Sequence, residues 1–280
     1  MNIIENFRSL NEFLRVVGNR TPNKVFTKVS LASETGSKSF TMTNTYGESV
    51  ELMTTGYEEG LSKLINNGNG LNSKFMSRCA KNIPTTSVVG FTPHVPNAIT
   101  GNPFSMISTR SVRMKTKTIH IVYDGGAACN IDAEEFVTAG QNLINMILQL
   151  ELKGYRVKLD IIQIFALHKE KAFCLINVKD YRQPINPLKL SYFLIHPSFF
   201  RRQGFRWLET TPSLSDREFI SGYGRPLKFI INSKDKSGKD AGKFLHDNKI
   251  IKEDASYISI YEAMRLKPED LIKEFELINI

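Results

Sequence analysis

The sequence predicts an α/β protein with a doubly wound, mostly parallel sheet, one antiparallel edge hairpin and a small helical or extended region ahead of it. Three observations lead to this fold class. The run KTIHIVYD, 117–124, is apolar enough for a central strand and leads into a long amphipathic helix. Two further strand-like runs are joined by only five residues, ALHKE, too few for a crossover helix. After them, helix and strand patterns alternate.

The expected elements after residue 115 follow the order β-α-β-β-α-β-α-β-α. The first helix begins at Asn130 or Asp132 and ends before Gly154, a residue suited to a helix C-terminus. Right-handed crossovers would place a functional crevice at the carboxyl ends of the strands. The later segments are the hairpin strands YRVKLDIIQIF and KAFCLINVK, a helix opened by Asn186-Pro187, a strand LKFIIN, a helix GKDAGKFLHDN, a strand YISIYEA and a final helix at 267–278.

Residues 1–84 are expected to form a helical and mixed N-terminal region. Its opening MNIIENFRSLNEFLRVV is interpreted as an amphipathic helix rather than a secretory signal, because glutamates interrupt its apolar residues. Two short helices are expected at 44–56 and 57–68, each followed or ended by glycine.

Residues 85–114 form a third region, rich in proline and apolar side chains, ahead of the α/β domain at 115–280. Its prolines and glycines forbid a long helix and favour extended or turn conformations. An apolar, irregular segment must lie against something. It either packs along the following domain or serves as a docking arm for a partner.

The chain carries a formal net charge of +9, which attracts phosphate backbones, anionic lipids or an acidic partner. No run of eighteen apolar residues occurs, so neither a membrane span nor a membrane partner is expected. Cys79, Cys129 and Cys174 lack the spacing of a disulfide framework or a zinc site, which favours buried thiols.

Catalytic motifs are sparse. There is no G-x-S-x-G elbow and no phosphate-binding loop of the G-x-x-x-x-G-K-[ST] or G-x-G-x-x-G type. The five histidines fall on separate predicted elements, and no spacing forces two carboxylates together. An enzymatic role is left open but is not favoured.

The helix-free link between the second and third strands resembles the von Willebrand factor A (VWA) fold over roughly residues 116–280. In that family an Asp-x-Ser-x-Ser loop after the first strand holds a divalent metal. Here the loop keeps Asp124, but glycine and alanine replace both serines. The resemblance therefore implies a vestigial site at Asp124. No cofactor is expected, and Mg²⁺ is only a minor alternative, because one carboxylate with neutral amides is a poor cage.

The resemblance also implies a function, since VWA domains bind protein partners through the rim of this site. The favoured hypothesis is a non-catalytic interaction or assembly module, with a protein partner or self-association through Asp124, Asn186, Asn232 and Ser233. The segments PHVPNAITGNPFSMI, HPSFFRRQGFRW and GYGRP are similar to uncharacterised bacteriophage-encoded proteins. That likeness implies a location in the bacterial host cytoplasm or in a virion.

The alternative hypothesis is nucleic-acid binding. The segment FFRRQGFRW, 199–207, interleaves arginines with aromatic rings, and these could bind phosphates and stack on bases. The same string suits an amphipathic helix whose aromatics enter the core while its arginines face water. The residues assigned to a nucleic-acid surface are Arg201, Arg202, Arg206, Trp207, Arg225, Lys234 and Lys236, the last two in the lysine loop 232–240.

Overall fold

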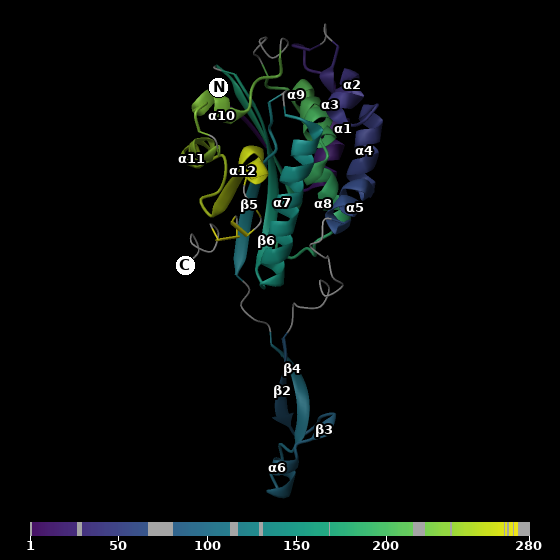
Figure 1. Cartoon of the computed structure of the whole chain (residues 1–280), viewed down its shortest axis with the longest axis vertical. Coiled ribbons are helices and arrows are strands. Elements are labelled where there is room, and N and C mark those ends of the chain that lie inside the picture. Colours follow the sequence, from purple (N-terminus) through teal and green to yellow (C-terminus); the bar gives the residue numbers. More distant parts are fainter. Residues whose placement is uncertain are drawn as a thin grey trace.

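A five-stranded sheet forms the centre of the protein in a computed structural model (Figure 1). The structure describes residues 2–26, 30–66, 81–112, 117–128, 131–167, 169–214, 222–235, 237–265, 267, 269–270 and 272–273. The sheet order is β1-β7-β6-β5-β8, and three of its four pairings are parallel. The strands are β1 (Asn2–Phe7), β5 (Thr118–Asp124), β6 (Arg156–Ala166), β7 (Lys171–Lys179) and β8 (Ala255–Ser259). The predicted mixed α/β class with a mostly parallel sheet is confirmed.

The antiparallel hairpin forms, but its predicted place at the sheet edge is wrong. β6 and β7 pair antiparallel, as the short link between them requires. Outside β7, however, β1 adds a parallel strand that pairs Asn2 with Lys171. The opening residues were predicted to be helical, yet Ile3 and Phe7 are buried with exposed residues between them, as in a strand. The helix begins only at Leu10.

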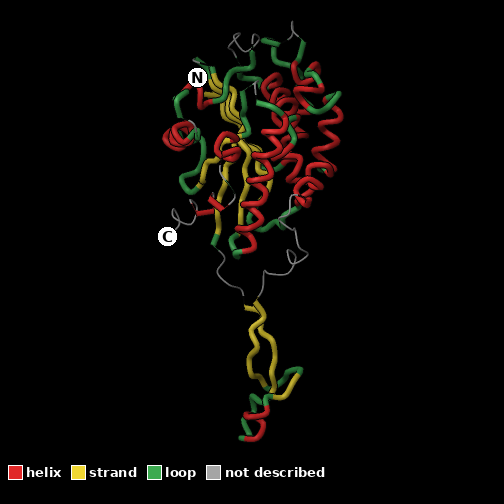
Figure 2. The backbone as a smooth tube through the Cα atoms, in the orientation of Figure 1, coloured by secondary structure: helices red, strands yellow, loops and turns green. Residues whose placement is uncertain are grey.

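One face of the sheet is covered by helices that share its main core (Figure 2). They are α1 (Leu10–Gly18), α7 (Ala133–Leu152), α8 (Pro187–Ile195), the π-helix η2 (Phe199–Gly204), α9 (Phe205–Thr210) and α12 (Ile260–Arg265). An outer layer packs on α8 and η2: α2 (Ala32–Thr35), α3 (Lys38–Thr41), α4 (Tyr46–Thr55) and α5 (Glu58–Asn66). Helices α4, α5 and α7 confirm predicted ones. Because Phe13, Met53 and Tyr57 lie in this core, the N-terminal residues are integral to the α/β body.

The opposite face carries α10 (Leu227–Ile231) and α11 (Lys239–Asp247) over a second apolar cluster. LKFIIN was predicted to be a strand, but α10 is a helix that buries Leu227 against this face. A short apolar run has no periodicity to separate the two structures, which explains the error. The predicted helix at 267–278 lies largely outside the described residues.

A separate three-stranded unit stands away from the body (Figure 1). It contains β2 (Lys81–Ser87), β3 (Thr92–Pro93), α6 (Val95–Ile99) and β4 (Met106–Val112), with strand order β2-β4-β3. We call residues 81–112 the arm, and residues 88–104 its tip. Of the two expected arrangements, packing of this segment along the α/β domain is wrong, since six of its large apolar side chains are exposed.

Candidate functional site

Asp124, the predicted vestigial metal ligand, lies buried at the carboxyl end of β5. Its Oδ1 accepts a hydrogen bond from the Gly126 amide at 2.8 Å, and its Oδ2 accepts one from the Tyr257 hydroxyl on β8 at 2.8 Å. Burial raises the pKa of Asp124 to about 6, and both hydrogen bonds oppose that rise. The carboxyl group thus ties β5 to β8 and to the following loop.

The magnesium ion implied by the VWA resemblance does not fit these donors. Both oxygens of Asp124 already accept hydrogen bonds, and Gly126 and Ala128 stand at the two serine positions. The Ala128 amide donates to the Tyr261 hydroxyl at 3.0 Å, which fixes the loop further. Within the part of the chain that the structure describes, no three His, Cys, Asp or Glu side chains are grouped to hold a metal. No metal chemistry follows from this donor set.

Asn232 and Ser233 lie at the same end of the sheet as Asp124. Ser259 pairs with Asp124 in the strand register, and its hydroxyl donates to the Ser237 carbonyl. The loop that follows Asn232 is therefore held against the end of β8. Asn232 itself is exposed and donates from Nδ2 to Asp240 at 2.7 Å.

Asn186 lies towards the opposite end of the sheet. It caps the start of α8 by accepting from the Lys189 amide at 3.1 Å. The end of α8 is beside the first half of α7, because a Cβ on Gly140 would stand 2.2 Å from the Leu194 carbonyl oxygen. Asn186 is one helix length, about 12 Å, before that point. The four residues predicted to form one rim therefore do not converge, because β7 reverses the chain direction before α8 begins.

The predicted nucleic-acid segment 199–207 is buried in the protein. Arg202 is fully buried and donates five hydrogen bonds to residues 33–43. Arg201 is also buried, donates to the carbonyls of Phe40 and Ile131, and lies 4.1 Å from the centre of the Phe40 ring. These guanidinium groups hold the outer helices onto η2, so no phosphate can reach them. Their predicted binding role is wrong for that reason.

The remaining members of the predicted basic surface are dispersed. Trp207 is fully buried and donates from Nε1 to Glu5 at 3.0 Å. Arg206 is partly buried and pairs with Glu34 at 3.1 Å. Arg225 and Lys234 are exposed on separate segments, and Lys236 is outside the described residues. The predicted patch therefore does not form from the residues that the structure places.

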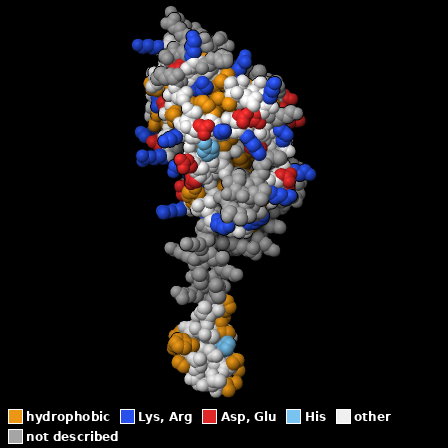
Figure 3. Space-filling view, turned by 90° about the vertical axis from the view of Figure 1, so that its left-hand side faces the viewer, with side chains coloured by type: hydrophobic (Ala, Val, Ile, Leu, Met, Phe, Trp, Pro, Cys, Tyr) orange, Lys and Arg blue, Asp and Glu red, His pale blue; other side chains and the backbone are white. Residues whose placement is uncertain are grey.

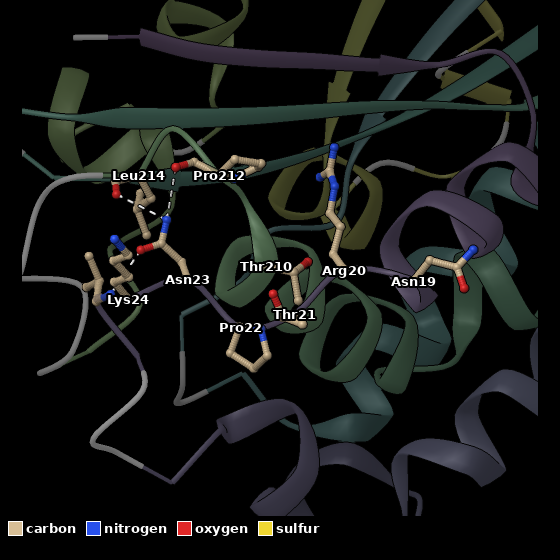
Figure 4. Close-up of a pocket in the computed structure, with 10 residues that line it drawn as sticks. Asn19, Arg20, Thr21, Pro22, Asn23, Lys24, Thr210, Pro212 and Leu214 are labelled. Atoms are coloured by element: carbon tan, nitrogen blue, oxygen red, sulfur yellow. Dashed lines mark hydrogen bonds between the residues drawn. The ribbon is translucent and has the colours of Figure 1, made fainter.

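A cavity of about 730 Å³ opens between α1 and the end of α9 (Figure 4). Asn23 crosses it and donates from Nδ2 to the carbonyls of Thr211 and Pro212 at 2.7 and 3.1 Å. Arg20, also in the lining, pairs with Glu5 at 2.8 Å. The lining side chains are polar, cationic or apolar, and they include no carboxylate, histidine or cysteine. Among the described residues, the lining has the Lys24 amine and the hydroxyls of Thr21 and Thr210, but no second titratable group that would pair with them as an acid or base.

The tip of the arm presents an apolar surface to solvent. Of the nine exposed large hydrophobic side chains among the described residues, six lie on it: Val88, Val89, Phe91, Val95, Ile99 and Phe104. Val89 is 78% exposed and Ile99 is 80% exposed. Hydrophobic side chains lie on both flanks of the tip in the space-filling view (Figure 3). A concentration of exposed apolar side chains of this kind marks an interaction site.

Local hydrogen bonds hold the tip in shape. His94 accepts from the Asn97 amide at 3.3 Å and caps α6. Asn97 donates from Nδ2 to the Phe104 carbonyl at 2.9 Å, and Asn102 accepts from the Phe104 amide at 2.9 Å. These bonds join the two sides of the tip without help from the body. The apolar side chains are thus displayed on an ordered scaffold.

The family comparison covers the whole chain. A family model described as "Domain of unknown function (DUF7192)" matches residues 1–280. The chain belongs to the DUF7192 family. Neither a curated protein nor a solved structure matches it. No helix in the described residues is both long and apolar enough to cross a membrane.

The arm of this DUF7192 chain has a sequence signal that pattern reading missed. Residues 60–123 contain no Asp or Glu and eight Lys or Arg, so they carry eight of the nine net positive charges. Within them, residues 82–109 contain no Lys, Arg, Asp or Glu at all. The sequence therefore did indicate the tip. It is a long stretch without charged residues but with several large apolar ones, and it lies inside a basic segment.

Proposed function

We propose that this protein is a non-catalytic interaction or assembly module that docks onto a protein partner through the tip of its arm. The observation that carries the proposal is the exposed apolar surface of six side chains on an ordered scaffold. Protein interfaces bury aromatic and aliphatic anchors at their centre and are depleted of charge there. The charge-free tip, with Phe91 and Phe104, has this composition.

We also propose that the α/β body is a variant of the VWA fold. The order β7-β6-β5-β8, with β7 antiparallel, and the short β6–β7 link support it. β1 and α10 depart from the arrangement expected from the sequence. The strand-end surface near Asp124 and Asn232 is then a second contact region, and Asn186 belongs to another face. The setting that the sequence likeness implies, a phage-infected cytoplasm or a virion, is part of this proposal.

Site-specific photo-crosslinking tests the docking role. A photo-reactive amino acid replaces Ile99 in the full chain, which is made in the cells that naturally produce it. The matched control places the same group at Leu152, an exposed apolar position on α7. We expect a discrete protein adduct from position 99, a yield at least tenfold lower from position 152, and loss of the adduct when Val89→Ser and Phe91→Ser are added.

Equal labelling from both positions, or an adduct that survives the tip substitutions, would show that the tip does not dock. Absence of any protein adduct at position 99 would also overturn the proposal. Circular dichroism and unfolding of the serine variant check that its body is intact. The tip side chains are already exposed, so we expect the unfolding free energy to stay within about 0.5 kcal/mol.

A further inference from the structure

We infer that the partner of the arm is a protein with an apolar socket rimmed by carboxylates, and this inference rests on the proposed docking role. The arm divides into two chemically different parts. Its tip has no formally charged residue. Its base, the end that joins the body, has cationic residues, and no acidic residue occurs in the sequence between Glu59 and Asp124. A matching surface needs apolar side chains at its centre and negative charge at its rim.

The strand register places the cationic residues at the base. Lys81 pairs with Val112 and Arg110 pairs with Ile83, so both lie at the end of the arm remote from Ser87 and the tip. Lys117 is exposed just before β5, where the chain enters the body. β2 has seven residues and spans about 20 Å, which separates this base from the tip. A partner that encloses the tip therefore has the register positions of Lys81 and Arg110 near its rim.

The tip suits a protein better than a lipid layer. Neutral polar residues, Thr92, Thr100 and Asn102, are exposed among its apolar side chains. Polar groups are costly among acyl chains but pair well across a protein interface. The tip also has no Trp or Tyr, the residues that favour the membrane–water boundary.

Two other occupants fit less well. A nucleic acid draws its affinity from phosphate contacts with Lys and Arg, and the most protruding part of the arm has neither. A second copy of this chain repeats the same excess of positive charge along its own arm. Like charges facing each other oppose association. The charge pattern therefore points to a different, acidic protein.

The test uses the Ile99 photo-crosslinker in two charge variants of the full chain. The base variant combines Lys81→Gln, Arg110→Gln and Lys117→Gln. The matched control combines Lys38→Gln, Lys169→Gln and Lys243→Gln, which removes the same charge from exposed positions elsewhere on the body. Adduct formed in a short light pulse is measured in extracts of the same cells between 50 and 500 mM salt. Rim charges act mainly on the rate of association (~10 Å screening length at 0.1 M).

We expect the base variant to lose at least tenfold of the adduct at low salt and most of its salt dependence, while the control keeps both. If the base and control variants behave alike, or if the adduct yield does not change with salt, the inferred acidic rim of the partner is wrong. The proposed docking through the tip would not be affected by that result. If no tip-dependent adduct forms at all, the proposed function itself fails.

Three further measurements separate the other occupants, each made with the chain and its Val89→Ser, Phe91→Ser variant. They are sedimentation with phosphatidylglycerol vesicles, gel shift with short single-stranded and duplex DNA and RNA, and light scattering after gel filtration. Tip-dependent binding to vesicles or nucleic acid, or a tip-dependent dimer, would overturn the inference. We expect none of the three.

Discussion

The arginine-rich segment 199–207 and the apolar tip 88–104 show the reverse of the burial that their compositions favour. The arginine-rich segment lies inside the protein, and the apolar tip lies in solvent. The first contains three arginines, and two of them are buried. The second contains no Lys, Arg, Asp or Glu, and its large apolar residues are in solvent. A charged side chain can be buried if every donor finds an acceptor, whereas an apolar one stays outside if no surface of its own chain covers it.

The buried arginines gain that compensation from backbone carbonyls. Arg202 donates to the carbonyls of Ser33, Glu34, Gly36 and Thr43 at 2.8–3.2 Å and to the Thr43 hydroxyl. Ser33 is held from its other side by the Glu209 carboxylate, which accepts from the Ser33 amide at 3.0 Å. These contacts make the segment that carries α2 and α3 part of the core.

The largest expected effect comes from breaking this compensation. Arg202→Met keeps an apolar stem but leaves several buried carbonyls without a donor, so we expect the free energy of unfolding to fall by about 3–5 kcal/mol. Urea unfolding followed by circular dichroism measures the change. The matched control is Arg225→Met, since Arg225 is exposed and its substitution should stay within about 0.5 kcal/mol. Equal losses in both variants would contradict the comparison.

His196 gives the next effect, through pH. It is buried against the Tyr57 and Tyr192 rings, and its Nδ1 accepts from the Ser198 amide at 3.2 Å. Burial lowers the pKa of His196 to about 4, below its ordinary 6.5. The folded state therefore favours the neutral ring, and this stability is complete above pH 6.5 and is lost as pH falls towards 4.

We expect this one group to cost roughly 2 kcal/mol of stability between pH 7 and pH 5. His196→Asn retains an acceptor and removes the titration. The stability gap between the parent and the variant should therefore narrow by that amount on acidification. The measurement is urea unfolding at pH 7, 6 and 5. A gap that does not change with pH would show that the ring is not held neutral.

Asp124 should give the smallest effect, with the opposite sign. Its folded pKa of about 6 lies above its ordinary 3.8. The stabilisation of the folded state by protonated Asp124 is therefore present at low pH and is lost as pH rises through 6. Between pH 7.5 and pH 5 the parent should gain about 1 kcal/mol relative to Asp124→Asn. Urea unfolding at both pH values measures this difference.

Asp247→Asn is the control for Asp124, because Asp247 is exposed on α11. This variant removes an exposed carboxylate and leaves the buried Asp124 in place. The difference in unfolding free energy between it and the parent should therefore stay nearly constant with pH. The His196 and Asp124 contributions oppose each other over the same pH range. The parent protein alone would therefore show only the difference between the two contributions, and the variants separate them.

The fold was predictable where local spacing limits the possibilities. A five-residue link allows only a hairpin, which forms as β6 and β7. The pattern after residue 132 gives α7, and Gly154 adopts φ +94° just beyond it, as expected of a residue that ends a helix. β1 and α10 were missed because a few apolar residues fit either a helix or a strand, and the segments that they contact lie far away in sequence.

The candidate site was less predictable, because exposure is not a local property. The segment FFRRQGFRW has the same sequence whether its arginines contact water, a phosphate or the carbonyls of residues 33–43, so the sequence does not distinguish these cases. The predicted strand-end rim was wrong at Asn186. Because β7 runs antiparallel to β6, α8 begins at the other end of the sheet. The arm was partly visible, since the charge-free window 82–109 is a property of the sequence.

The sequence by itself determined the α/β class, the antiparallel hairpin, the long helix and the concentration of positive charge in residues 60–123. These follow from periodicity, link length and composition, which act between near neighbours in the chain. Only the tertiary structure decided which side chains face solvent. It buried Arg202 and left Ile99 80% exposed, because burial depends on whether distant segments supply a matching surface. For the arginine that surface is residues 33–43, whereas the apolar tip stands apart from the body.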